Sequence, residues 1–220
     1  MVKIERTPTA PKSLALESQK VNGSYREADV IDQLKKDFHD KCYICELNKL
    51  TDIQVEHLLP HHNRTIKERV FDWNNLFYSC PHCNSMKKEP RYDEKILDCC
   101  QVDPELLINH IWLDNDVVVE AIGDCPDEKA LMTAELIQNC FGKDNTGIRK
   151  VQCAARYDRL AETMNNLYRT LGEFKKDKTS PKYFRALRAM LKREYKFAAF
   201  TRYYVRSHLA DYPELKDFVS

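Results

Sequence analysis

Two pairs of closely spaced cysteines constrain this 220-residue chain more than any other feature of its sequence. Cys42-Tyr-Ile-Cys45 and Cys80-Pro-His-Cys83 each place two thiols on one side of a tight turn, and together they supply the four sulfur ligands that suit Zn²⁺. One such pair could be a redox centre, but two pairs around a polar segment favour metal binding. We therefore expect a structural zinc ion without an open coordination position; free or redox-active thiols are the alternative.

The other cysteines show no ligand spacing. An odd total of nine, in a chain whose first twelve residues contain no apolar signal segment, is poorly explained by disulfides. No apolar run approaches the roughly 20 residues that would span a bilayer. These features predict a cytoplasmic protein without a membrane partner. The cysteines that we expect to be core residues or free thiols are Cys99, Cys100, Cys125, Cys140 and Cys153.

Outside the cysteine-bracketed segment, the sequence predicts mostly helices, because glycines are few and runs of Ala, Leu, Glu, Lys and Arg are long. We expect an α+β, mainly helical chain in three parts: an N-terminal arm and helix (1–41), a core with zinc knuckles (42–105), and a C-terminal domain of a hairpin and a helical bundle (106–220). The expected elements are an arm over 1–24, helices over 27–40, 127–141 and 146–174, a helix start at Asp103-Pro104, a hairpin within 110–121 around Asp114-Asn115-Asp116, and a last helix from Ser180-Pro181 towards His208.

The segment between the two cysteine pairs is longer than in a simple zinc ribbon. It carries Glu56-His57 and Asn75, and Asn84 follows directly after the last cysteine of the second pair. This arrangement resembles the HNH endonucleases, in the variant whose last position is Asn and whose core is bracketed by C-x-x-C pairs. The resemblance covers residues 42–88, and it implies a ββα-metal fold that hydrolyses phosphodiester bonds.

The resemblance implies a role for each of these residues. His57 matches the general base that takes a proton from the attacking water, and Asn75 matches the amide that fixes the loop between the strands and so orients His57. Glu56 and Asn84 match the ligands of the catalytic metal ion, for which carboxylate and amide oxygens favour Mg²⁺ or Mn²⁺. Lys87 follows Asn84 by one helical turn, where it could reach a phosphate oxygen.

Some of these assignments have alternatives. Asn74 could be the structural amide in place of Asn75, and Asn84 could only cap its helix. His61 and His62 follow the first expected strand and could contact metal or phosphate, but solvated loop residues are the simpler interpretation.

Two groups of basic residues could contact nucleic acid. The group around the expected cleft, in which Lys87, Lys88 and Arg64 are the favoured phosphate contacts, consists of Arg64, Lys67, Arg69, Lys87, Lys88 and Arg91. The group in the last expected helix, with Glu194 almost alone against it, consists of Lys182, Arg185, Arg188, Lys192, Arg193, Lys196, Arg202 and Arg206. For this second group, contact with nucleic acid and docking of a protein are equally supported.

A wider resemblance covers most of the chain. The Ile4-Glu5-Arg6 start with prolines after it, the helix before Cys42, the HNH-like core, the hairpin and the helical tail are together similar to the HNH subunits of Septu-type and retron-associated anti-phage systems. This layout implies a bacterial defence nuclease that works with an ABC/SMC-like ATPase and, in some systems, with a reverse transcriptase and its RNA–DNA product. We expect a metal-dependent endonuclease with DNA favoured over RNA; a non-catalytic zinc-ribbon nucleic-acid binder or an adaptor is the alternative.

Overall fold

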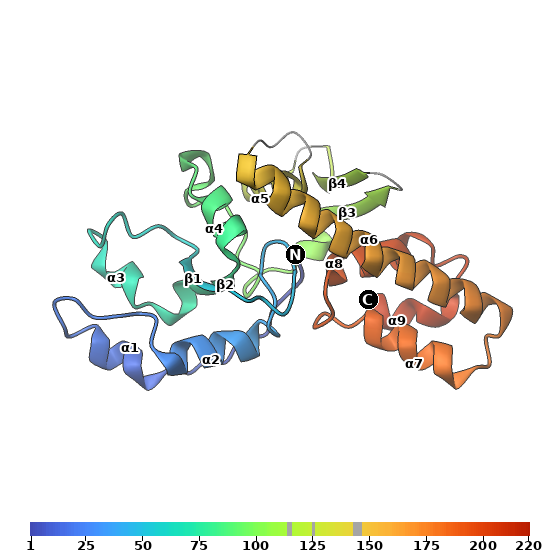
Figure 1. The fold of residues 1–220 in the computed structure, drawn as a ribbon, viewed down its shortest axis with the longest axis horizontal. Coiled ribbons are helices and arrows are strands. Elements are labelled where there is room, and N and C mark those ends of the chain that lie inside the picture. The colour runs from blue at the N-terminus through green and yellow to red at the C-terminus, as the bar shows by residue number, and fades with distance from the viewer. Residues whose placement is uncertain (114–115, 125, 143–146) are drawn as a thin grey trace.

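The computed structural model describes residues 1–113, 116–124, 126–142 and 147–220. About half of the chain is helical, and two small antiparallel sheets are found in these ranges, so the expected mixed and largely helical class is confirmed. The molecule is elongated, with the first sheet and the N-terminal helices at one end and the C-terminal helices at the other (Figure 1). Within the described ranges, no helix is long and apolar enough to cross a membrane.

The elements follow one another in a simple order. The helices are α1 (Lys12–Glu17), α2 (Ala28–Asp37), α3 (Lys67–Val70), α4 (Pro81–Lys87), α5 (Glu128–Phe141), α6 (Gly147–Lys176), α7 (Pro181–Met190), α8 (Ala198–Ser207) and α9 (Lys216–Val219). The strands are β1 (Gln54–His57) and β2 (Leu76–Ser79), which pair with each other, and β3 (Ile108–Leu113) and β4 (Asp116–Ala121), which form the second pair.

The first sheet and the helix after it position the polar residues of the cysteine-bracketed segment. β1 and β2 are antiparallel, with His57 opposite Leu76. α4 begins just after β2, and the sulfur of its N-cap residue Cys80 accepts a hydrogen bond from the backbone N–H of Cys83. Apart from the short helix α3 and a 3-10 turn between the two strands, the chain therefore runs strand, strand, helix through this segment, with α4 packed beside β1.

Most expected elements are present with shifted ends. α2, α5 and α6 correspond to the three expected helices, and β3 with β4 is the expected hairpin. The expected turn residues Asp114 and Asn115 lie outside the described residues. Asp103-Pro104 begins only a short 3-10 turn, Pro104–Leu106, because the chain enters β3 directly after it.

The expectation of one last helix is wrong, because two helices, α7 and α8, take its place. The chain leaves the helical path over residues 191–197, and Phe197 adopts a left-handed φ of 52°. The ammonium group of Lys41 donates hydrogen bonds to the carbonyl oxygens of Arg193 (2.5 Å) and Tyr195 (3.0 Å), which the break has freed from helical bonding. These contacts come from far along the chain, so local periodicity could not predict the break.

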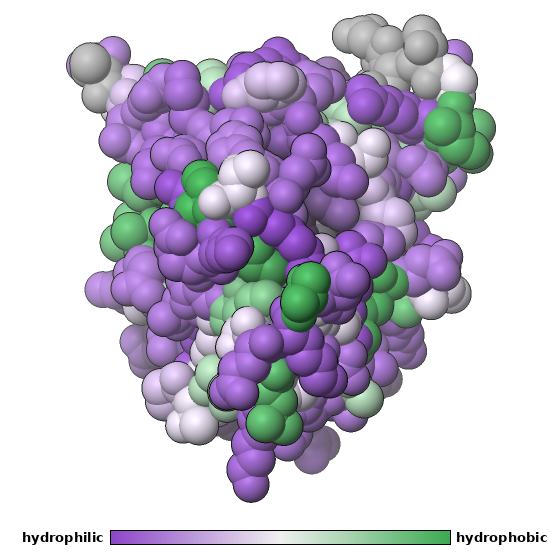
Figure 2. Space-filling model, turned by 90° about the vertical axis from the view of Figure 1, so that its left-hand side faces the viewer, coloured by the Kyte–Doolittle hydropathy of each residue, from purple (hydrophilic) through white to green (hydrophobic). Residues whose placement is uncertain are grey.

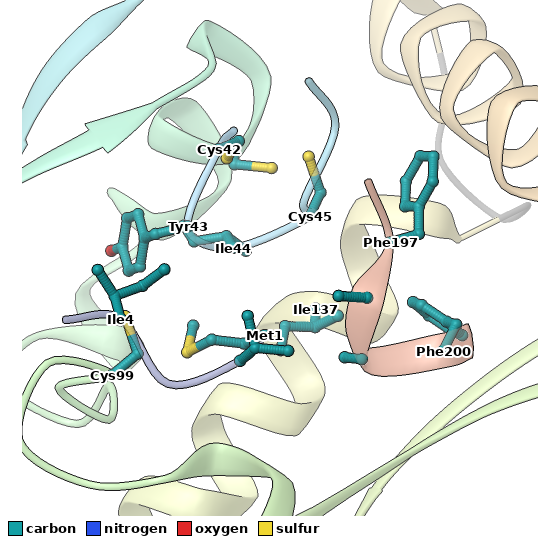
Figure 3. Packing of buried hydrophobic residues seen from close by; sticks show 14 of the residues in the cluster. Met1, Ile4, Cys42, Tyr43, Ile44, Cys45, Cys99, Ile137, Phe197 and Phe200 are labelled. Carbon is teal, nitrogen blue, oxygen red and sulfur yellow. The ribbon is translucent and has the colours of Figure 1, made fainter. Parts of the chain in front are cut away.

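The three expected parts of the chain contribute to one hydrophobic core. In Figure 3, Met1 lies between the turn that carries Tyr43 and Ile44 and the residue Ile137 of α5. Phe197 of the 191–197 segment lies at the C-terminal end of α5, where its ring centroid is 6.3 Å from that of Phe141. The first four residues of the N-terminal arm are thus packed inside the molecule, between the first sheet and the C-terminal helices.

Candidate functional site

A cavity of about 390 Å³ opens beside the end of β1. It brings together five residues that the sequence predicted as site residues, Glu56, His57, Asn84, Lys87 and Lys88. The surface at the α1 and α3 end of the molecule is mostly hydrophilic, with scattered apolar residues (Figure 2). The cavity is lined by Tyr25, Arg26, Val55, Glu56, His57, Pro60, His61, His62, Asn63, Asn84, Lys87, Lys88 and Asp93.

His57 is held with one ring nitrogen available to the cavity. Its Nε2 lies 3.0 Å from the carbonyl oxygen of Val70. Because a carbonyl oxygen can only accept, Nε2 carries the proton and Nδ1 keeps a free lone pair. Burial, the largest cause, lowers the pKa of His57 from 6.5 to about 4. The imidazole is therefore neutral at pH 7 and able to accept a proton.

Asn75 is buried and joins the two ends of the loop that connects β1 to β2. Its Oδ1 accepts a hydrogen bond from the backbone N–H of Leu59 at 2.7 Å, and its Nδ2 donates to the carbonyl oxygens of Leu59 and Arg69 at 2.9 and 3.0 Å. Asn74 is exposed, and only its backbone contacts Arg6. The amide that holds the loop behind His57 is thus that of Asn75.

Glu56 is buried, and both of its carboxylate oxygens have partners. The hydroxyl of Tyr43 donates to Oε2 at 2.7 Å, and the ammonium of Lys87 lies 2.7 Å from Oε1. Lys87 also donates to the carbonyl oxygens of His57 and Leu58 at 3.1 and 2.9 Å, which occupies its three N–H donors. Lys87 therefore fastens α4 to β1 instead of pointing to solvent, which differs from its expected contact with phosphate.

Asn84 and Asp93 provide the open oxygen atoms of the cavity. The N-cap of α4 is Cys80, so Asn84 is not a cap. The described part of the chain offers no hydrogen-bond partner to the Asn84 amide. Mg²⁺ keeps several waters and needs only one or two protein oxygens, so the amide and carboxylate oxygens of these two lining residues are of the type that such an ion binds. Glu56 fits less well, because Lys87 already neutralises its charge.

The four predicted zinc-binding cysteines form one buried cluster, which confirms their expected grouping. Their sulfur atoms all lie within 4.8 Å of one another, and those of Cys45 and Cys80 are 4.0 Å apart. Tetrahedral Zn–S bonds of about 2.3 Å imply sulfur–sulfur distances of roughly 3.8 Å, so the donor set and its spacing fit zinc. The thiols of Cys42 and Cys45 lie on the same side of their turn (Figure 3).

The C-terminal helices cover this cluster. Arg156 of α6 donates to the sulfur of Cys80 at 3.0 Å, and the thiol of Cys83 donates to the sulfur of Cys140 in α5 at 3.4 Å. Hydrogen bonds from the other three thiols, and then the charge of Arg156, hold the pKa of Cys80 far below its ordinary value despite burial. Sequence spacing gave no sign of Arg156. As expected, Cys99, Cys140 and Cys153 are buried and Cys100 is half-buried, while Cys125 lies outside the described residues.

Several residues of the basic C-terminal group have internal partners. The buried carboxylate of Glu105 accepts hydrogen bonds from Arg193, Arg202 and Arg206, at 3.1, 2.8 and 3.2 Å respectively. Glu194 is the only acidic residue within this segment of the sequence, and the fold adds Glu105 from a distant part of the chain as a second opposing charge. The cations of this group that are exposed are Lys182, Arg185, Arg188 and Lys192.

The basic residues near the cavity also differ from one another. Lys88 is exposed at the cavity, whereas Arg64 donates to the carbonyl oxygen of Gly23 at 2.8 Å and lies outside the lining. Arg69 and Arg91 pair with acidic residues. Sequence reasoning missed Tyr25, whose ring packs edge-on against His57 with centroids 4.5 Å apart. Nothing in the irregular arm signals this contact.

The cavity thus combines a proton acceptor at His57, open oxygens at Asn84 and Asp93, and the exposed cation of Lys88. These groups suit hydrolysis of a negatively charged ester, because they can activate water and bind an anion or a divalent cation. Comparison with protein-family models, curated proteins and solved structures finds no significant match to this chain.

Proposed function

We propose that this chain is a metal-dependent endonuclease of the HNH class, which hydrolyses phosphodiester bonds with DNA as the favoured substrate. The observation that carries the proposal is the state of His57. Its Nε2 is bound to the Val70 carbonyl, no described residue binds its Nδ1, and the residue lines a cavity that Asn84 also lines. The strand–strand–helix succession and the loop held by Asn75 support the same function.

In the proposed reaction, Nδ1 of His57 accepts a proton from the water whose oxygen attacks phosphorus. The bond from phosphorus to the leaving oxygen breaks, this oxygen takes a proton from solvent, and His57 returns its proton to solvent. Asn84 and Asp93 would hold Mg²⁺ or Mn²⁺, and Lys88 would attract the phosphate backbone. When bound, the divalent ion neutralises charge on the phosphate and the leaving oxygen.

Zinc has a different role in this proposal. Four thiolates complete a tetrahedral shell, so a zinc ion held by them has no position for water or substrate. None of the four cysteines lines the cavity. Zinc would therefore stabilise the turn before β1 and the start of α4.

The proposal includes a partner. The sequence layout resembles that of Septu-type and retron-associated HNH subunits, and this resemblance supports an ABC/SMC-like ATPase as that partner. The complex would act in the bacterial cytoplasm. In retron-associated systems it would also include a reverse transcriptase and its RNA–DNA product. The exposed cations of α7, which are Lys182, Arg185 and Arg188, offer a surface for such an assembly that is separate from the cavity.

Cleavage of supercoiled plasmid DNA and of tRNA tests the nuclease function, with the purified chain alone and with the candidate ATPase. Mg²⁺ or Mn²⁺ should be omitted and restored, because a strong chelator would also compete for zinc. We expect metal-dependent cutting that falls by about 10²–10⁴ in His57→Ala. Asn74→Ala is the matched control, because its exposed side chain lies outside the cavity.

The alternative is a non-catalytic zinc-ribbon binder or adaptor. It predicts no cutting with either ion, with or without the ATPase, by protein that is folded and contains zinc. Binding to nucleic acid, if present, would then be the same for the wild type and His57→Ala. This combination of results would overturn the nuclease proposal.

A further inference from the structure

The loop after β1 has a backbone that few residues adopt. His62, Asn63 and Arg64 follow one another with positive φ angles of 44°, 54° and 67°. Left-handed conformations are unfavourable for residues other than glycine, and they persist only where surrounding contacts impose them. Here the backbone N–H of Ile66 donates to the carbonyl oxygen of His61 at 3.3 Å, which closes the loop.

This loop conformation fixes the orientation of His61. The backbone N–H of Arg64 donates to Nδ1 of His61 at 2.9 Å. Because a backbone N–H can only donate, Nδ1 is unprotonated, and the proton of the neutral ring is on Nε2. The guanidinium of Arg64 donates to the carbonyl oxygen of Gly23, so the loop is also tied to the N-terminal arm.

His57 and His61 are therefore complementary. Their ring centroids are 4.5 Å apart with an interplanar angle of 84°, and both rings line the same cavity. His57 offers a free lone pair on Nδ1, whereas His61 offers a proton on Nε2. Among the described residues, no partner occupies Nε2 of His61. One ring can accept a proton while the other donates a hydrogen bond.

We infer that His61 is a second catalytic residue, whose Nε2–H donates a hydrogen bond to a non-bridging oxygen of the scissile phosphate. The inference rests on the proposed nuclease function. Negative charge on these oxygens needs fixed donors at the transition state, and a donor that is already oriented pays no reorganisation cost at that moment. His61 transfers no proton in this role, so the proton transfers of the proposed hydrolysis still involve only His57 and solvent. Burial lowers the pKa of His61, which keeps the ring neutral and the bond to Arg64 intact at pH 7.

Two variants separate donation to the substrate from support of the loop. His61→Gln places an amide N–H near the position of Nε2, and His61→Asn places an amide oxygen near Nδ1, where it can still accept from Arg64. If His61 donates to phosphate, kcat falls on the order of 10²-fold in His61→Asn and clearly less in His61→Gln, with little change in KM. If His61 only accepts the hydrogen bond that closes the loop, His61→Gln loses more activity than His61→Asn, and the inference is overturned.

A second measurement does not depend on cleavage. ¹⁵N NMR of the histidine rings in the full chain should show His61 protonated on Nε2 and His57 with an unprotonated Nδ1. A proton on Nδ1 of His61 would overturn the inference even in a chain that cuts normally. A wild-type chain that never cuts removes the proposed function and this inference together. A wild-type chain that cuts, with both His61 variants equally active, removes this inference alone.

Discussion

Glu56 and Glu105 are both buried carboxylates that pair with basic residues, but only Glu56 lies beside a cavity. Glu56 is bound by Lys87 and Tyr43 at the edge of a cavity, and free hydrogen-bonding atoms lie beside it. Glu105 lies in the 3-10 turn Pro104–Leu106 and is bound by three arginines, one from the 191–197 segment and two from α8. There Arg202 also donates to the carbonyl oxygen of Leu191 at 2.9 Å.

The comparison shows that a buried ion pair alone does not mark a functional site. Around Glu105 the charged groups bind one another and backbone carbonyls, so they join α8 to the segments around it. Around Glu56 the ion pair fastens β1 to α4, and His57 and Asn84 keep atoms open to the cavity. Side-chain atoms that remain open to a cavity beside the ion pair distinguish the candidate site from the region around Glu105.

Cys80→Ser should have the largest effect, and it acts on the first region. Cys80 is a member of the sulfur cluster, the N-cap of α4 and the partner of Arg156. We expect zinc loss and a drop in unfolding free energy on the order of 10 kcal/mol, measured by metal analysis and thermal unfolding. Cys100→Ser, half-buried and outside the cluster, is the control and should keep its zinc. Full zinc content and an unchanged melting temperature in Cys80→Ser would contradict the site.

Glu105→Gln should have the next largest effect, and it acts on the second region. The change leaves Arg202, which is only 4% exposed, without its charged partner. We expect a loss of about 3–5 kcal/mol in unfolding free energy by chemical denaturation, with an unchanged cleavage rate per folded molecule. Glu194→Gln, an exposed acidic residue nearby, should change stability by less than about 0.5 kcal/mol. If Glu105→Gln abolished cleavage in folded protein, the two regions would not be functionally separate.

The pH dependence of cleavage sharpens the comparison at His57. Its folded pKa of about 4 predicts a kcat/KM that changes by less than about twofold from pH 7 to 5.5, whereas an ordinary imidazole would lose roughly eightfold. Since the unfolded chain binds the proton first, the contribution of His57 to stability is complete above pH 6.5 and is lost as pH falls towards 4. A fall of kcat/KM with an apparent pKa near 6.5 as the pH is lowered would show that the ring of His57 is not desolvated.

The smallest effect is expected from the exposed C-terminal cations. Combining Arg188→Gln with Lys192→Gln should change unfolding free energy by less than about 0.5 kcal/mol and leave cleavage by the isolated chain unchanged. Lys88→Gln, at the cavity, should instead raise KM for nucleic acid, most strongly at low salt. An equal rise in KM in the double variant would extend the nucleic-acid surface to α7 and remove the distinction between the regions.

Local patterns in the sequence predicted much of the candidate site. The spacing of Cys42, Cys45, Cys80 and Cys83 predicted the buried cluster, and the order of His57, Asn75 and Asn84 predicted which residues meet near β1 and α4. Apolar periodicity predicted α2, α5 and α6. These features depend on neighbouring residues, since turn geometry and helical repeat act over only a few positions.

Tertiary structure alone decided which charged and aromatic side chains are free. Lys87 forms an ion pair with Glu56, and Arg202 donates hydrogen bonds to Glu105. Tyr25 packs against His57, which lies in a distant part of the sequence. At the break between α7 and α8, the carbonyl oxygens of Arg193 and Tyr195 accept hydrogen bonds from Lys41, which lies about 150 residues earlier in the chain. A cation can pair with any carboxylate or carbonyl that packing brings near it, so its partner follows from the packing of the whole chain and not from its neighbours in sequence.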